Sequence, residues 1–459
     1  MKNKINAAEL SNRSHWMALL QYAVPLMFTG VLQLLFNAAD VVVVGRFAAD
    51  GEQALGAVGS TSSLINLLVN VFMGLSVGAS VCVSKHFGAN NEKEVGRAVH
   101  TSVMLSIIAG VFVMIVGEIG SYTFLSWMKT PPQLIDKATL YMRIYFIGIP
   151  ANMVYNFCAA IVRSVGNTKV PFVIISLAGI INILLNVIFV LVFGMDVDGV
   201  AWATTISQIL AAISMVIYLV RSNDVIKLRL SKLHINKKML VEILTVGIPA
   251  GIQSAFFSIS NVIIQSSING FGDIAVSGNT AASNIEGFLY TMMNSFYHAC
   301  LTFTGQVVGA GQRKRTTSIL LKCLIYVTVV GVFLGVFVGV FCGESLLKIY
   351  LPKAESAEAR NYGAVRLSIV CLSYFLCGIL DVLVGSMRGM GTSLTAMIGV
   401  LIGACGLRIV WVNTIFKLSP TLMTLYIAYP VSWLITDLVF AVLYIINRNR
   451  LVNGKRVMP

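Results

Sequence analysis

The sequence predicts an all-α integral membrane protein with twelve transmembrane helices arranged in two pseudo-symmetric six-helix lobes. Composition is the first observation: 57% of the 459 residues are hydrophobic and 11% are charged, whereas about 25% of residues are charged in a soluble protein. The second is the length of the apolar runs, and the third is an internal repeat. So few charges cannot form an aqueous surface, which excludes a soluble enzyme, a nucleic-acid-binding protein and a disordered chain.

The apolar runs define the spans in chain order. A membrane-spanning helix needs about 20 mostly apolar residues, and these runs are far longer than the ~10-residue alternating strands of a β-barrel. The first run continues past Pro25 to Val44 without a cleavage motif, so we expect a retained span and not a signal peptide. The predicted spans are 17–44, 54–84, 98–124, 138–162, 171–193, 200–220, 241–269, 275–307, 317–343, 361–386, 393–416 and 421–447.

Basic residues predict the orientation of these spans. If the N-terminus is cytoplasmic, 23 of the 33 Lys and Arg lie in cytoplasmic segments and 7 lie in outer segments. Because positively charged loops stay on the cytoplasmic side, we expect a multi-pass protein of the cell membrane with both termini in the cytoplasm. The net charge of +14 then faces anionic lipid headgroups and not a nucleic acid.

The two halves of the chain share a pattern of residues. Six spans in each half insert both halves in the same orientation, so an axis along the membrane normal should relate them, and transporters of this kind bind substrate between their halves. We expect lobes over 1–221 and 241–459, joined by a basic cytoplasmic linker over 222–240. The recurring anchors are Pro25, Asn37 and Phe47 with Pro249, Asn261 and Phe271, then Gly88-Ala89 with Gly309-Ala310, and Arg163-x-x-Gly166 with Arg388-x-x-Gly391.

Asp40 is the leading candidate for an ion-coupling residue, because a charge inside the bilayer costs at least ~2.5–3.5 kcal/mol and is rarely kept without a function. A buried carboxyl can carry a proton, and a carboxylate among amide oxygens can bind Na⁺. Asn182 and Asn186, one helical turn apart in IINILLNVIFV, and Thr204 in GVAWATTIS are candidate partners. Pro25 permits a bend in the same helix as Asp40, which makes it a candidate hinge.

Simpler interpretations of these residues stay open. Asp40 lies near the end of its span and could reach the outer surface. The two asparagines could only bond neighbouring helices together, which is worth ~0.6–2 kcal/mol for each bond. Pro25 could produce a static kink.

Carboxyl groups in the second half lie at positions that are not equivalent to that of Asp40. Glu286 is the preferred carboxylate for a cationic substrate, and Asp381 is a second candidate that could instead pair with Arg388. Asp437 is a further acid within a span. Neighbouring aromatic and methionine side chains could line an adaptable cavity, so the substrate-binding candidates are Glu286, Asp381, Phe288 and Met292.

Cysteines and catalytic motifs give no sign of enzymatic chemistry. The eight cysteines lie almost all within apolar runs, so we expect small buried side chains without disulfides or a metal site. The sequence contains no Walker A loop, HExxH or GxSxG motif. We therefore expect no enzyme and no resident cofactor, with an ion gradient as the energy source.

Taken together, these features resemble the multidrug and toxic compound extrusion (MATE) transporters over nearly the whole chain. The resemblance implies two six-helix lobes and export of amphiphilic, often cationic compounds in exchange for Na⁺ or H⁺. In many bacterial members the ion site uses an aspartate in the first helix, an Asn and an Asp in the fifth, and a Thr in the sixth. The matching residues are Pro25 with FNAAD (36–40), VGRF (44–47), the two Gly-Ala pairs, RSVGNTKVP (163–171), Asn182, Asn186, GVAWATTIS (199–207) with Thr204, and MRGMGTS (387–393).

Asn186 departs from this pattern, because many relatives have a second aspartate there. Asp40 would then carry the coupling nearly alone, and the stretch SAFFSISN (254–261) lacks the glutamate of some sodium-coupled relatives. We therefore expect H⁺ over Na⁺, a small-molecule substrate and a monomer in the lipid bilayer. Two alternatives stay open: a flippase for lipid-linked oligosaccharide or peptidoglycan precursors, favoured if Arg143, Arg366 and Arg408 line the cavity, and a non-transporting membrane scaffold or sensor.

Overall fold

A computed structural model describes residues 6, 14–47, 51–128, 130–352, 356–455 and 457. In these residues every regular element is a helix. Ten helical stretches are long and apolar enough to cross a membrane, and a pair bent by 49° makes an eleventh. The 37-residue α8 is long enough as well, about 55 Å at 1.5 Å per residue, although its polar side chains lower its hydropathy. With α8 the described residues contain twelve candidate crossings, in agreement with the number predicted from the sequence.

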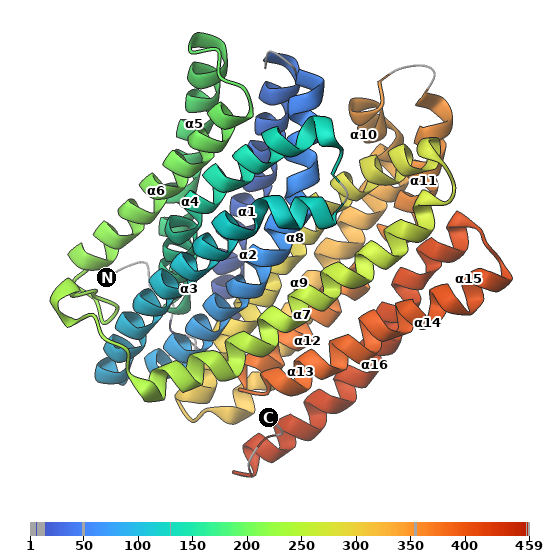
Figure 1. Cartoon of the computed structure of the whole chain (residues 1–459). Helices are drawn as coiled ribbons and strands as arrows, with labels where there is room; N and C mark the ends of the chain where they lie inside the picture. Colours follow the sequence, from blue (N-terminus) through green and yellow to red (C-terminus); the bar gives the residue numbers. More distant parts are fainter. Residues whose placement is uncertain are drawn as a thin grey trace. The chain divides into compact units, whose positions relative to one another are not determined.

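Several of the crossings consist of more than one helix (Figure 1). Short π-helical turns at Ile188–Val192, Phe337–Cys342 and Leu401–Gly406 extend α5, join α9 to α10, and join α13 to α14. The bounds are α1 Ser14–Phe47, α2 Gly51–Gly88, α3 Glu92–Trp127, α4 Pro132–Ser164, α5 Lys169–Val187, α6 Val197–Arg221, α7 Lys237–Asn269, α8 Asp273–Gly309, α9 Thr316–Val336, α10 Gly343–Tyr350, α11 Ala357–Val370, α12 Tyr374–Gly389, α13 Ser393–Val400, α14 Leu407–Asn413, α15 Ile415–Leu418 and α16 Leu422–Val452.

The tenth predicted span, 361–386, is not one continuous helix. It breaks between α11 and α12, which are bent by 49°. At the break the Ser373 hydroxyl donates to the carbonyls of Ile369 and Val370, at 2.8 and 3.1 Å. A serine that bonds the preceding turn competes with the backbone ladder and bends a helix. The apolar pattern crosses the break without interruption, so it could not reveal the bend.

The chain forms two compact units, and the helices α1 and α7 contribute to both. In the described chain the first unit contains Val31–Gly251, and the second contains Asn6–Gly30 with Ile252–Pro459. Each division falls a few residues after a proline, Pro25 in α1 and Pro249 in α7. The segment 222–240, expected as a linker, lies within the first unit.

Equivalent turns in the two halves have the same backbone conformation. Asn90 and Gly311, 221 residues apart, have φ of 53° and 75°, and both follow a Gly-Ala pair. Gly166 and Gly391, 225 residues apart, have φ of 82° and 90°. The residue after each positive-φ glycine donates to the carbonyl five positions before it, Asn167 to Val162 and Thr392 to Met387. The repeat in the sequence is therefore a repeat of helix ends, where only a residue that tolerates a left-handed conformation ends the helix in this way.

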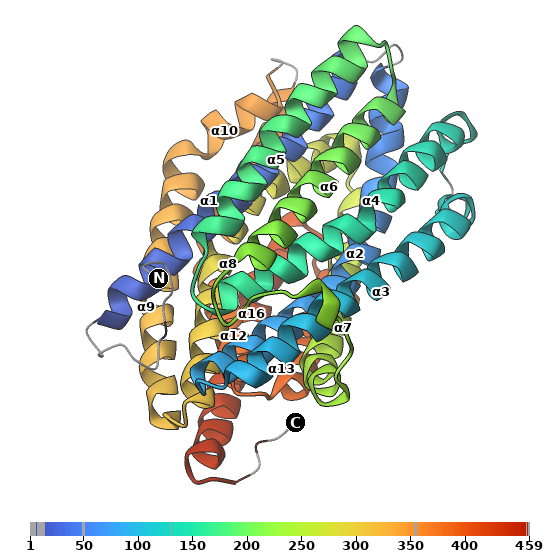
Figure 2. The same ribbon diagram turned by 90° about the vertical axis from the view of Figure 1, so that its left-hand side faces the viewer.

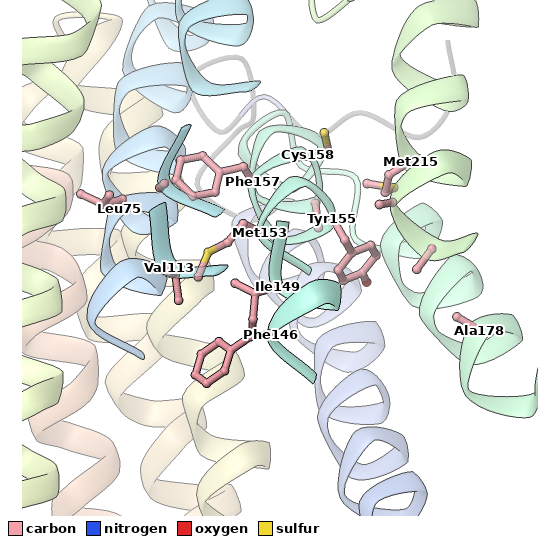
Figure 3. Close-up of a cluster of buried hydrophobic side chains, with 14 of the residues drawn as sticks. Leu75, Val113, Phe146, Ile149, Met153, Tyr155, Phe157, Cys158, Ala178 and Met215 are labelled. Carbon is pink, nitrogen blue, oxygen red and sulfur yellow. The ribbon is translucent and has the colours of Figure 1, made fainter. Parts of the chain in front are cut away.

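The core of the first unit is centred on α4. Its side chains Phe146, Ile149 and Met153 recur at helical spacing, and Figure 3 shows Met153 beside Val113 of α3. The α3 and α4 helices lie side by side (Figure 2). They approach closely where the ring of Phe146 covers a glycine of α3, Gly117, which has no room for a Cβ atom. Close approach at small residues is the usual way in which helices associate in a bilayer.

Candidate functional site

The predicted ion-coupling residues lie together in the first unit. Asp40 of α1 accepts a hydrogen bond from Asn186 Nδ2 of α5 at 2.5 Å. Asn186 Nδ2 also donates to Asn182 Oδ1 at 3.4 Å, and Asn182 Nδ2 donates to Thr204 Oγ1 of α6 at 3.3 Å. Three helices thus bring the four side chains into one hydrogen-bonded chain.

A glycine on α5 explains why α1 and α5 approach closely enough for this contact. The ring of Phe36 covers Gly179 and occupies the place where a Cβ atom would lie. Phe36 and Asp40 are one turn apart on α1, so they share a face. Gly179, Asn182 and Asn186 are likewise spaced by three and four residues on α5. The small residue sets the crossing point, and the asparagines beyond it reach Asp40.

The hydrogen-bonded chain has oxygen atoms of three kinds. Asn182 and Asn186 are 5% and 0% exposed, while Asp40 is half-buried and also interacts with the Thr204 hydroxyl. The Asn186 Oδ1 atom is buried and has no hydrogen-bond partner among the described residues. Carboxylate, amide and hydroxyl oxygens suit a proton or a hard cation such as Na⁺, and these four residues are the ones that could hold it.

Two tyrosines of α4 complete the surroundings of Asp40, and neither is among the site residues predicted from the sequence. The rings of Tyr141 and Tyr145 stack with centroids 6.3 Å apart. Both interact electrostatically with Asp40, and Tyr145 is hydrogen-bonded to Gln208 of α6. Two hydroxyl-bearing rings spaced by four residues inside an apolar span are the sequence signal that could have identified them.

Glu286, the preferred carboxylate for a cationic substrate, is engaged in a buried ion pair. Its two oxygens accept hydrogen bonds from Arg366 Nε and Nη2, each at 2.7 Å, and both residues are 5% exposed. Arg366 Nη1 also donates to Asn279 at 2.5 Å. Bidentate pairing of this kind neutralises both groups. Arg366 therefore occupies the place beside the Glu286 carboxylate that the sequence analysis assigned to a cationic substrate.

Arg408 lies in the second unit among aromatic rings. It is 1% exposed, and its guanidinium lies 4.4 Å from the ring centroid of Tyr429 and 5.3 Å from that of Phe257. It donates to Ser432 and Asn261, at 3.1 and 3.3 Å, while Nη2 has no hydrogen-bond partner among the described residues. Arg143, by contrast, is exposed on α4.

The remaining candidates of the second unit lie on three helices. Asp381 of α12 accepts a hydrogen bond from Asn294 at 3.4 Å. Asp437 of α16 is 7% exposed, neither of its oxygens has a hydrogen-bond partner among the described residues, and it interacts electrostatically with Asp381. Phe288 and Met292 are half-buried on α8, one turn apart. Arg388, the suggested partner of Asp381, interacts with it electrostatically and donates its hydrogen bonds to Tyr297 and Gln253, at 2.5 and 2.9 Å.

Comparison with known sequences agrees with this architecture. The sequence model of the MatE family matches residues 25–188 and 249–413, and each match begins at one of the equivalent prolines. The probable multidrug resistance protein YoeA of Bacillus subtilis is 26% identical over 392 residues, which cover 84% of this chain and 83% of that protein. The multidrug export protein MepA of Staphylococcus saprophyticus is 21% identical over 440 residues, 95% of each.

Solved structures share the fold over the full length. A MATE protein crystallised in complex with MaL6 matches with a TM-score of 0.91 at 18% identity, over 99% of this chain and 100% of that one. A MOP superfamily transporter from Pyrococcus furiosus, for which the reverse polarity of the binding pocket suggests a different function, matches with a TM-score of 0.90 at 19% identity, over 98% of this chain and 99% of that one.

Proposed function

Because the chain belongs to the MatE family of multidrug transporters, we propose that it is an ion-coupled antiporter that exports amphiphilic, often cationic small molecules. The observation that carries the proposal is the hydrogen-bonded chain from Asp40 through Asn186 and Asn182 to Thr204. It places one ionisable group among neutral amides and a hydroxyl, inside a helix that crosses the membrane. The charge of such a group changes when it binds or releases an ion, and this change can drive the conformational step of a transport cycle.

We propose H⁺ as the coupling ion. The oxygens of Asn182 and Thr204 already accept hydrogen bonds from neighbouring amides. The oxygens of the four residues that accept no amide hydrogen bond are Asp40 Oδ2 and Asn186 Oδ1. Na⁺ and Ca²⁺ sites generally collect several oxygen ligands, whereas a proton needs one oxygen of Asp40. Na⁺ would require Asn182 and Thr204 to give up their mutual contact.

A hinge in α1 would connect protonation of Asp40 in the first unit to the second unit. α1 belongs to the second unit up to Gly30 and to the first unit from Val31, and Asp40 lies beyond that division. Five residues before the division, Pro25 interrupts the hydrogen-bond ladder, and the Thr29 hydroxyl donates to the Pro25 carbonyl at 2.8 Å. A change of charge at Asp40 would therefore act on a helix that is built to bend near Pro25.

Flux measurements in proteoliposomes test the function and identify the ion. We expect uptake of a cationic dye to follow an imposed pH gradient, and to stay near the level of protein-free vesicles under a sodium gradient alone. The opposite preference would assign the site to Na⁺. Vesicles that show no flux of any dye under either gradient would favour a scaffold or sensor and would contradict the proposal.

A second prediction tests the contact that brings Asp40 to the asparagines. We expect Gly179→Val to lower export strongly, because the added side chain would displace Phe36 and separate α1 from α5. Gly59→Val on α2 is the matched control, since a Cβ atom there meets nothing within 4 Å. Initial rates of dye transport, normalised to folded protein by gel filtration, provide the measurement. Equal rates for the two variants would show that this crossing is not needed for coupling.

Arg408 supports a second candidate function. Its buried guanidinium has an unpartnered nitrogen among aromatic rings, an arrangement that suits an anionic amphiphile such as a lipid-linked precursor. The exposed Arg143 and the paired Arg366 do not add to such a site. Competition of an anionic and a cationic amphiphile in the same flux assay separates the two candidates. In either case we propose a monomer in the cell membrane, with both termini cytoplasmic and without a resident cofactor.

A further inference from the structure

A seam between α2 and the first part of α7 has a cluster of metal-binding side chains at one end. Gly74 and Gly78 of α2 meet the α7 backbone at Gly251 and Gly247, where a Cβ atom has no room. The same face of α2 continues at spacings of four residues. It reaches Cys82 and His86, while α7 continues in the opposite direction to Glu242. All of these residues belong to the first unit.

The three side chains at this end of the seam converge. Cys82 Sγ lies 3.7 Å from Glu242 Oε2, and His86 Nε2 lies 3.1 Å from the same oxygen. The three ligand atoms lie within 4.8 Å of one another. Around a tetrahedral Zn²⁺, with bonds of about 2.3 Å to sulfur and about 2.0 Å to nitrogen and oxygen, the sulfur and oxygen ligands are about 3.5 Å apart and the nitrogen and oxygen about 3.3 Å apart. The observed separations are already close to these values.

We propose that Cys82, His86 and Glu242 bind a divalent transition-metal ion of the Zn²⁺ class, which links α2 to the first part of α7. Thiolate, imidazole and carboxylate form a ligand set that Zn²⁺ uses, and residues at i and i+4 on one helix face can supply two of its ligands. On binding, the Cys82 thiol loses its proton to water. The resulting thiolate and the Glu242 carboxylate together balance the double positive charge.

The surroundings of the site are compatible with an added ion. Cys82 is 2% exposed, and the side chains of His86 and Glu242 are 12% and 27% exposed, so one side remains open to solvent. Glu94 of α3 interacts electrostatically with Cys82, and its Oε2 is buried without a hydrogen-bond partner among the described residues. Lys85 Nζ lies 4.0 Å from Glu242 but is 48% exposed and can turn toward solvent. Water can fill a fourth coordination position from the open side.

No metal site is predicted from the sequence, although two of the three ligands lie close together in it. Cys82 and His86 are separated by three residues, a helical metal-binding spacing that is visible in the sequence. The third ligand follows 156 residues later than His86, and only the packing of α7 on α2 brings it close.

Cobalt substitution tests the site on the purified full-length protein after removal of any affinity tag. We expect one Co²⁺ per chain, with the visible bands of tetrahedral cobalt and a sulfur-to-cobalt charge-transfer band, both removed by an equivalent of Zn²⁺. Cys82→Ala should abolish the charge-transfer band, and Glu242→Gln should weaken binding more than about tenfold. Cys158→Ala, which changes a buried cysteine elsewhere in the same unit, should retain the band.

Two results would overturn the proposal. One is the lack of a charge-transfer band in the unmodified protein, which would leave His86 and Glu242 as an ordinary ion pair. The other is a band that persists in Cys82→Ala, which would assign the metal to another thiol. If Cys82→Ala does not fold, Cys82→Ser replaces it, and melting temperatures with and without Zn²⁺ then show whether the metal stabilises the unmodified chain and not the variant. None of these readouts depends on transport activity.

Discussion

Asp40→Asn is expected to abolish ion-driven export and to leave the fold intact. The substitution preserves the size of the side chain and an oxygen that can accept the hydrogen bond from Asn186. It removes the only group of the Asp40–Asn186–Asn182–Thr204 chain that can change its charge. Without that change, an ion gradient has no means of acting on this part of the protein.

The measurement is dye export from loaded proteoliposomes under the gradient that drives the unmodified protein. Rates should fall to the level of protein-free vesicles, while binding of the dye and the melting temperature in detergent change little. Asp136→Asn, at an exposed carboxyl on α4, is the matched control and should retain full export. Full export by Asp40→Asn would assign the coupling to another residue, and the unpartnered Asp437 would then be the first to examine.

Arg366→Met is expected to destabilise the second unit strongly. It leaves the carboxylate of Glu286 buried, 5% exposed, without the two hydrogen bonds that neutralise it. Removing one partner of a buried ion pair typically costs about 3–5 kcal/mol, because the remaining charge stays buried. The guanidinium also contacts the rings of Tyr426 and Tyr429, at 5.6 and 5.4 Å, and these contacts are lost as well.

The double variant Glu286→Gln with Arg366→Met separates charge from packing. It removes both charges, so its melting temperature in detergent should lie much closer to that of the unmodified protein than that of Arg366→Met does. Lys348→Met, which removes one partner of the exposed pair with Glu344, is the control and should have little effect. If Arg366→Met melts like the unmodified protein while Glu286→Gln alone changes the preference for cationic dyes, Glu286 is a substrate ligand, as its sequence position had suggested.

The site formed by Asp40, Asn182, Asn186 and Thr204 could be predicted in part from local sequence patterns. Asn182 and Asn186 share a helix face by their spacing, and a lone acid inside a span is costly enough to attract attention. Both facts are local and can be read without a structure. The contact between α1 and α5 is different, because it depends on the ring of Phe36 covering Gly179. Nothing in the sequence pairs these two residues.

For Glu286 and Cys82, local sequence patterns did not predict the residues that surround them. The acid within a span of the second half suggested a cationic ligand, whereas an arginine 80 residues later along the chain neutralises it. The cysteine in an apolar run suggested an inert thiol, whereas His86 and Glu242 lie against it. The division of α1 and α7 between the two units likewise cannot be read from the runs of apolar residues.

From its residues alone, this protein is determined to be a twelve-span helical membrane protein with two repeated halves. Hydropathy and the residues that end helices are properties of short segments, so they can be read from the sequence without knowledge of the rest of the chain. Only the tertiary structure decides which charges are neutralised, which polar atoms stay unpartnered and which helices belong to both units. Those outcomes depend on side chains that are remote in sequence, and small residues such as Gly74 and Gly179 allow the helices to meet closely enough to bring them together.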